Sequence, residues 1–119
     1  MKKLIFVSLL VLCSLNVFAG ISDVQTKGSW IVVYGDNGRE TSRMGINNKE
    51  LVGVSGSFFV VQDKSWIIIY DETCKEISRM GTNNKSVRGA AGSTFTVEDG
   101  SWIVTYDKNC REQNRRGKK

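Results

Sequence analysis

Three tryptophans at a fixed spacing are the residues of this chain with the clearest chemical use. Trp30, Trp66 and Trp102 follow one another at intervals of 36 residues. An exposed indole ring offers a large, rigid apolar surface with one polar N–H, so three of them would give equivalent platforms for sugar rings. The same spacing is typical of core residues in a repeat protein, and the sequence favours this second interpretation.

Polar residues repeat with the same period. They are Arg43 and Arg79, Asn48 and Asn84, and Lys49 and Lys85. Because guanidinium, amide and ammonium groups all donate hydrogen bonds, we hypothesise that these six residues and the three tryptophans form an anion- or carbohydrate-binding surface. The simpler alternative is that each arginine pairs with a nearby glutamate and keeps an edge strand soluble.

Catalysis is not expected from the residues present. The sequence contains no His, which excludes a Ser-His-Asp or Cys-His apparatus and removes the commonest zinc ligand. The candidate carboxylates lie in turns or on charged strands, where a raised pKa is not expected. They are Asp71, Glu72, Glu76, Asp107 and Glu112. We therefore predict no enzyme activity, no cofactor and no metal site.

Two cysteines occupy equivalent places in the repeat. Cys74 and Cys110 stand 36 residues apart, where the first repeat has Gly38. After export, a disulfide between them is the simplest expectation. Equivalent turns of neighbouring propeller blades lie farther apart than the ~7 Å between Cα atoms that a disulfide tolerates, whereas a solenoid would bring them within reach. A bond between the two cysteines would therefore favour the solenoid.

The elements that carry these residues are predicted to be β-strands. Residues 65–71 read Ser-Trp-Ile-Ile-Ile-Tyr-Asp, and close copies occur at 29–35 and 101–107. β-Branched and aromatic residues favour strands. Because the apolar residues form a run without alternation, the strand should be covered on both faces.

Each repeat divides into a small Gly-rich strand, two apolar strands and a charged strand. This is the pattern of a propeller blade, whose middle strands are buried on both sides. We predict an all-β protein of three antiparallel β-meander units of about 36 residues, propeller-blade-like, at about 22–57, 58–93 and 94–119. A β-trefoil-like fold and a short β-solenoid are the alternatives.

Residues 1–19 are predicted to be a signal peptide. Two lysines precede an apolar run over residues 4–12, and Ala19 ends a motif that signal peptidase cleaves. The run is shorter than the ~20 residues of a transmembrane helix. Leu12 is too bulky for a lipoprotein signal at Cys13. Residues 20–119 would then form a single all-β repeat domain, exported to the periplasm or secreted, without a transmembrane segment.

Composition narrows the range of partners. Removal of Lys2 and Lys3 leaves 15 basic residues against 12 acidic ones, a net charge of +3. Export and so small an excess argue against a nucleic-acid partner. Fewer than three complete blades would leave apolar faces at both ends of the chain, so we expect a homo-oligomer that completes a ring.

These observations predict a non-catalytic binding module whose target is a carbohydrate or an envelope protein. The alternative is a periplasmic structural, interaction or inhibitor protein without a small-molecule ligand. Exposed tryptophans would favour the first prediction, and fully buried ones the second.

Overall fold

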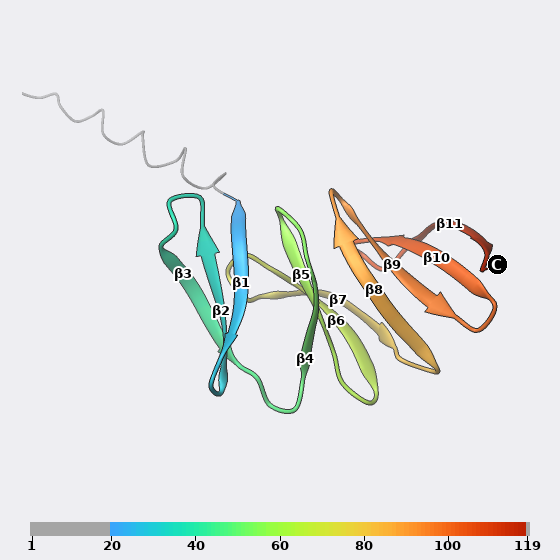
Figure 1. The fold of residues 1–119 in the computed structure, drawn as a ribbon, viewed down its shortest axis with the longest axis horizontal. Helices are drawn as coiled ribbons and strands as arrows, with labels where there is room; N and C mark the ends of the chain where they lie inside the picture. The colour runs from blue at the N-terminus through green and yellow to red at the C-terminus, as the bar shows by residue number, and fades with distance from the viewer. Residues whose placement is uncertain (1–19, 119) are drawn as a thin grey trace, which may run out of the picture.

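The computed structural model describes residues 20–118, so the predicted signal peptide lies outside the described part of the chain. This part is built of eleven β-strands and contains no helix. The strands form three antiparallel sheets of three, four and four strands. The sheets stand side by side, with the second in the middle (Figure 1). The prediction of an all-β chain is confirmed.

Each sheet is a meander, because strands that follow one another in the chain are hydrogen-bonded neighbours. The first sheet contains β1 (Ile21–Lys27), β2 (Trp30–Gly35) and β3 (Glu40–Gly45). The second contains β4 (Glu50–Val54), β5 (Phe58–Gln62), β6 (Trp66–Asp71) and β7 (Glu76–Gly81). The third contains β8 (Lys85–Ala91), β9 (Thr94–Asp99), β10 (Trp102–Asp107) and β11 (Glu112–Gly117).

The strands that begin with tryptophan, β2, β6 and β10, have the same surroundings in their sheets. Each tryptophan pairs with a glycine of the following strand, and the register shifts just before the tyrosine near the end of the strand. All pairings lie within one sheet and are antiparallel. The solenoid alternative, in which these strands would stack in parallel, is therefore wrong. Three separate sheets in place of a closed barrel also exclude the β-trefoil.

Both faces of the second sheet are buried. One face contributes Phe59, Val61, Ile68 and Tyr70 to a core shared with the first sheet. The other face contributes Phe58, Val60, Ile67 and Ile69 to a core shared with the third sheet. Full burial of an apolar side chain of this size stabilises a fold by roughly 1.5–3 kcal/mol. The unbroken apolar run of the sequence thus reflects burial on both faces, as predicted.

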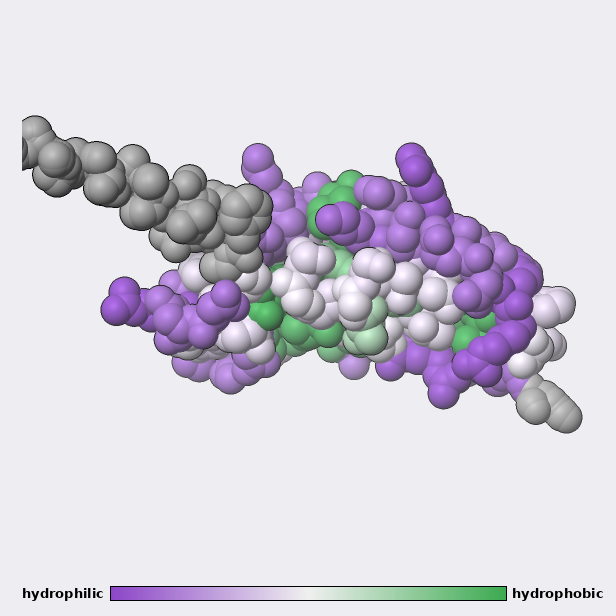
Figure 2. Space-filling view, turned by 90° about the horizontal axis from the view of Figure 1, so that it is seen from above, coloured by the Kyte–Doolittle hydropathy of each residue, from purple (hydrophilic) through white to green (hydrophobic). Residues whose placement is uncertain are grey.

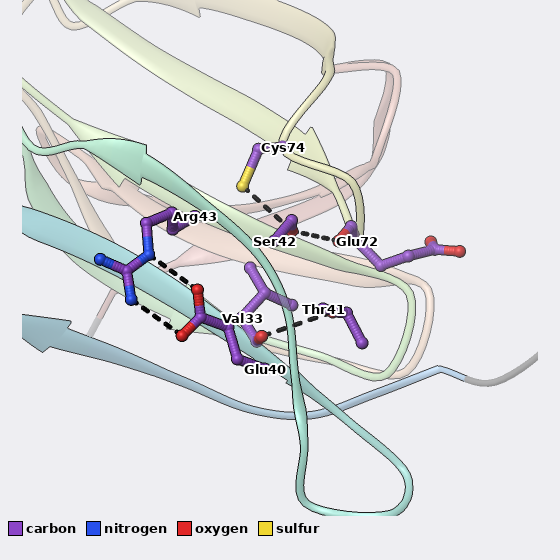
Figure 3. Close-up of polar contacts among 7 residues, drawn as sticks. All are labelled: Val33, Glu40, Thr41, Ser42, Arg43, Glu72 and Cys74. Atoms are coloured by element: carbon purple, nitrogen blue, oxygen red, sulfur yellow. Dashed lines mark hydrogen bonds and ion pairs between the residues drawn. The ribbon is translucent and has the colours of Figure 1, made fainter.

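Hydrogen bonds join neighbouring sheets at the two seams, the contacts of the second sheet with the first and with the third. The hydroxyl of Ser42 on β3 donates to the carbonyl of Glu72 at 2.7 Å (Figure 3). The hydroxyl of Ser78 on β7 donates in the same way to the carbonyl of Lys108 at 2.6 Å. Equivalent serines therefore hold equivalent turns of the next sheet.

Cys74 and Cys110 occupy turn positions that ordinarily favour glycine. Their φ angles are 65° and 63°, and Gly38 in the first sheet has a φ of 78°. Cys74 Sγ lies 3.3 Å from Ser42 Oγ, and Cys110 Sγ lies 3.2 Å from Ser78 Oγ. Burial raises the pKa of both thiols. Both cysteines are free, and they lie in different seams.

The two outer faces of this stack are polar. On the first sheet, Asp23 and Gln25 take the places that Phe59 and Val61 have in the second sheet. On the third sheet, threonines replace three buried residues of the second; they are Thr94 for Phe58, Thr96 for Val60 and Thr105 for Ile69. Seen from above, a pale to green band of less hydrophilic residues runs along the middle of the molecule between hydrophilic margins (Figure 2). Val32 and Ile103, in the middle strands of the end sheets, remain buried apolar residues that belong to neither core. The outer faces are therefore more polar than the two faces of the second sheet, although each keeps an apolar residue.

Candidate binding site

The three tryptophans are exposed, contrary to the interpretation that placed them in the core. The exposed fraction is 44% for Trp30, 40% for Trp66 and 44% for Trp102. Each is the first residue of its strand, and none belongs to the two core clusters. Their exposure at equivalent positions makes the three rings candidates for contact with a ligand or partner.

An arginine of the following strand lies over each tryptophan ring. The distance from the guanidinium carbon to the ring centroid is 5.2 Å for Arg43 and Trp30, 5.0 Å for Arg79 and Trp66, and 5.3 Å for Arg115 and Trp102. Cations attract aromatic faces within about 6 Å. The structure thus brings the predicted arginines to the predicted tryptophans and adds a third pair.

A glutamate fixes each of these guanidinium groups. Arg43 Nε donates to Glu40 Oε2 at 2.7 Å, and Arg43 Nη2 donates to Oε1 at 2.8 Å (Figure 3). These hydrogen bonds hold the pKa of Glu40 below its ordinary value. The two-pronged geometry fixes the plane of the guanidinium. We call the equivalent sets Trp–Arg–Glu clusters: Trp30–Arg43–Glu40, Trp66–Arg79–Glu76 and Trp102–Arg115–Glu112.

The ion pairs agree with the simpler interpretation of the repeated arginines. Each arginine pairs with the glutamate three residues before it, as that alternative predicts. Each also covers part of a tryptophan ring. The ion pairs lie at the surface, where such pairs add little stability. Their main effect here is to orient the arginine.

A hollow lies beside Trp66, at the end of the second sheet where β5 turns into β6. Its volume is about 560 Å³, it is open to solvent, and it is lined by Asn48, Asp63, Lys64, Ser65 and Trp66. Asn48 comes from the loop that precedes β4, and the other residues come from the β5–β6 hairpin. Because β4 pairs with β5, this loop lies beside the hairpin, and the second sheet itself forms the hollow.

Asp63 is held in a fixed position at this hollow. Its Oδ1 accepts hydrogen bonds from the N–H of Trp66 at 2.7 Å and from the N–H of Ser65 at 2.8 Å. These bonds lower the pKa of Asp63, and the charges of Lys49 and Arg79 lower it further. The hollow therefore contains an ionised carboxylate whose second oxygen can accept hydrogen bonds from a ligand.

The third sheet carries a related set of residues. Trp102 and Asp99 stand at the places of Trp66 and Asp63. Lys85 Nζ lies 3.9 Å from Asp99 Oδ2, its partner across the β8–β9 pair. Lys49 and Lys85 thus have corresponding places, each near the aspartate of its own sheet.

The paired asparagines of the connecting loops also have a backbone role. Asn48 and Asn84 have φ angles of 64° and 66°, and the preceding Asn47 and Asn83 have φ angles of 43° and 35°. Asparagine tolerates this left-handed region better than most residues. The side chain of Asn48 lines the hollow, whereas the clearest role of Asn84 is to shape its loop.

The first Trp–Arg–Glu cluster lacks the groups that complete the hollow. Lys27 stands at the place of Asp63, and its Nζ lies 5.6 Å from the centroid of the Tyr34 ring. The asparagine loop has no counterpart before β1 in the described part of the chain. Trp30 therefore offers an exposed ring without a fixed carboxylate beside it.

Several residues of this surface are absent from the candidates drawn from the sequence, among them Asp63, Asp99 and Arg115. The repeat spacing could have identified them, since Asp99 and Arg115 each stand 36 residues after their counterparts Asp63 and Arg79. Arg115 is hard to recognise because it lies among other basic residues near the C-terminus. The aspartates occur in hairpin sequences, where Asp is common for conformational reasons alone.

Comparison with known proteins finds no matching family model and no curated protein of significant sequence similarity. Within residues 20–118, no three His, Cys, Asp or Glu side chains are grouped in a way that could hold a metal ion. No helix of the described chain is long and apolar enough to cross a membrane. The geometry of the surface is therefore the basis for a functional assignment.

Proposed function

We propose that the protein is an exported, non-catalytic binding module of propeller-like repeats, and that it recognises carbohydrate through the hollow beside Trp66. The observation that carries this proposal is the exposed Trp66 ring next to a carboxylate that two backbone N–H groups hold in place. An aromatic surface with a few fixed polar groups is the usual composition of a small-ligand site.

Each group that lines the hollow has a role in carbohydrate binding. The Trp66 ring can stack on the C–H face of a sugar, and the indole N–H remains a donor. Asp63 accepts hydrogen bonds from sugar hydroxyls, and the Asn48 amide both donates and accepts.

The packing of the sheets supports the propeller-like part of the proposal. The small strands β4 and β8 approach closely, since a Cβ added at Gly53 would lie 3.2 Å from Ala90 Cβ. The apolar strands β5 and β6 occupy the middle of the second sheet, and the charged strand β7 forms its other edge. This order from small to apolar to charged is the order that a blade requires.

A glycan array with the exported protein tests the proposal. The Trp66→Ala variant should lose binding to any sugar that the unmodified protein retains, by about tenfold or more. Trp30→Ala is the matched control, because it removes an equally exposed ring that has no fixed carboxylate beside it, and it should bind normally. No array signal, or equal losses in the two variants, would contradict recognition at this hollow.

A protein partner of the envelope is the second candidate. The observation in its favour is that tryptophan and arginine, the residue types enriched at interface hot spots, recur together three times. This candidate predicts no glycan signal, and similar losses of partner binding when Trp30, Trp66 or Trp102 is changed to Ala.

A further inference from the structure

The residues that join neighbouring sheets have counterparts on the two outer faces of the stack. We propose that the outer face of the third sheet packs on the outer face of the first sheet of a second copy, in the geometry of the internal seams. Two copies would bring six sheets together, which is within the range of closed propellers. The proposal does not depend on carbohydrate binding.

The serine hydrogen bond of the internal seams has a counterpart between two copies. Ser78 on β7 donates to the Lys108 carbonyl and touches Cys110 Sγ. The residue 36 positions after Ser78 is Asn114 on β11, which would be the donor between copies. The acceptor would be the β2–β3 turn of a second copy, where Gly38 takes the place of Cys110. Asn is larger than Ser and Gly is smaller than Cys, so the Asn114–Gly38 pair would fill a space similar to that of each Ser–Cys pair.

An aromatic contact between the second and third sheets has a polar, partly charged counterpart between two copies. Phe58 of the second sheet meets Phe95 of the third edge to face, with ring centroids 6.5 Å apart. One repeat further on, the corresponding residues are Thr94 and Asp23 of a second copy. Both are smaller and polar, and a threonine hydroxyl can donate to a carboxylate.

The surroundings of Thr94 fit a carboxylate. On the outer face of the third sheet, a hollow of about 330 Å³ has Thr94, Arg88 and Arg116 in its lining. Asp23 is oriented on the opposite outer face, because its oxygens accept hydrogen bonds from the Val24 N–H at 2.9 Å and from Gln25 Nε2 at 2.8 Å. Arg88 Nε also lies 3.6 Å from Glu98 Oε2 of its own sheet, so Asp23 would share Arg88 with Glu98 and approach Arg116. The added guanidinium of Arg116 gives the two faces electrostatic complementarity at this point.

One internal contact has no counterpart in the proposed seam. Ser55 Oγ donates to the Gly92 carbonyl at 2.9 Å between the second and third sheets. The residue 36 places after Ser55 is Ala91, which cannot donate. The seam between copies is also more polar than the internal ones, so we expect an association weaker than an internal seam and sensitive to salt.

Engineered cysteines test the geometry directly. Asn114→Cys combined with Gly38→Cys should give a covalent dimer on oxidation, because the backbone at position 38 already resembles that of Cys74 and Cys110. Ser42→Cys is the positive control and should bond to Cys74 within one chain, since Ser42 Oγ and Cys74 Sγ are 3.3 Å apart. Asn114→Cys with Gly28→Cys is the negative control, because Gly28 is also an unobstructed turn glycine of positive φ.

The outcomes of the cross-linking experiment are distinct on a non-reducing gel. A dimer from the Gly38 variant, with none from the Gly28 variant, supports the proposal. If the positive control forms its bond and the Gly38 variant remains monomeric, the proposal is wrong. A ladder of higher polymers would also overturn it, since the contact would then not close between two copies.

Charge reversal tests the same contact without a covalent bond. The exported protein should have a dimer mass in light scattering at low salt, and Asp23→Arg should raise the dissociation constant by about tenfold or more. Adding Arg88→Asp and Arg116→Asp to Asp23→Arg should restore the dimer. These residues are exposed, so each variant should keep its fold, which circular dichroism verifies. A monomer mass for the unmodified protein, or no rescue, would refute the proposal.

Discussion

Cys74 and Cys110 illustrate how one position can meet two requirements. The backbone is left-handed there, which favours glycine, yet the side chain fills space between two sheets. Cysteine is a small apolar residue that fits both requirements. The first sheet has no preceding sheet within residues 20–118 to pack against, and there the residue is Gly38. The choice between Cys and Gly thus follows from the presence of a neighbour in the chain.

A substitution at Cys74 separates the two requirements. Cys74→Val fills the seam but places a β-branched residue at a positive φ, so it should destabilise the protein by about 1–3 kcal/mol. Cys74→Gly should cost less, because relief of the backbone offsets the lost packing. Urea denaturation of both variants measures this order. A valine variant more stable than the glycine variant would show that packing outweighs backbone conformation here.

At the scale of the element, the strands β3, β7 and β11 combine two tasks. They form one edge of each sheet, and their charged side chains protect that edge from pairing with other chains. The same strands supply the arginines that lie over the tryptophans of β2, β6 and β10. A feature that keeps an edge soluble thereby also sets the orientation and exposure of the candidate binding surface.

Removal of one such arginine should expose the ring without unfolding the sheet. In a protein with Trp30→Phe and Trp102→Phe, Arg79→Ala should increase acrylamide quenching of Trp66 and shift its emission to the red, because the guanidinium no longer covers the ring. Arg39→Ala in the same background is the control, since Arg39 lies in a turn of the first sheet. Unchanged quenching would mean that Arg79 does not shield Trp66 in solution.

For the molecule as a whole, stability depends on the second sheet. Both of its faces are covered, whereas the first and third sheets each have one polar outer face. Polar outer faces allow end units of a repeat array to remain soluble. The same position of the repeat is therefore valine in the second sheet, at Val60, and threonine in the third, at Thr96.

Exchange of valine and threonine at these two positions should change the free energy of unfolding by different amounts. Val60 is fully buried, so Val60→Thr places a hydroxyl in the core and should cost about 1–3 kcal/mol. Thr96 is half-buried on the outer face, and Thr96→Val should change stability by less than about 0.5 kcal/mol. Chemical denaturation at one protein concentration compares the stabilities of the two variants. Equal costs would show that the second sheet is not the main source of stability.

The sequence determined the local features of this protein. The repeated apolar run around Trp66, bounded by turn residues, required strands that pair with their neighbours in the chain, because β-branched and aromatic residues favour strands and short turns favour antiparallel pairs. The absence of alternation further required cover on both faces. These features depend on residue type and spacing, which a single sequence contains.

Only the tertiary structure decided which residues at the ends of the apolar run are buried and which are exposed. Trp66 belongs to the apolar run, yet it stands at the end of its strand, outside the two cores, so its exposure depends on how far the packed sheets extend. Asn48 and Asp63 meet because β4 pairs with β5, which places the loop before β4 beside the β5–β6 hairpin. The structure also explains why polar residues replace apolar ones on the outer faces. These faces lie at the ends of the stack, where the same chain has no further sheet to cover them.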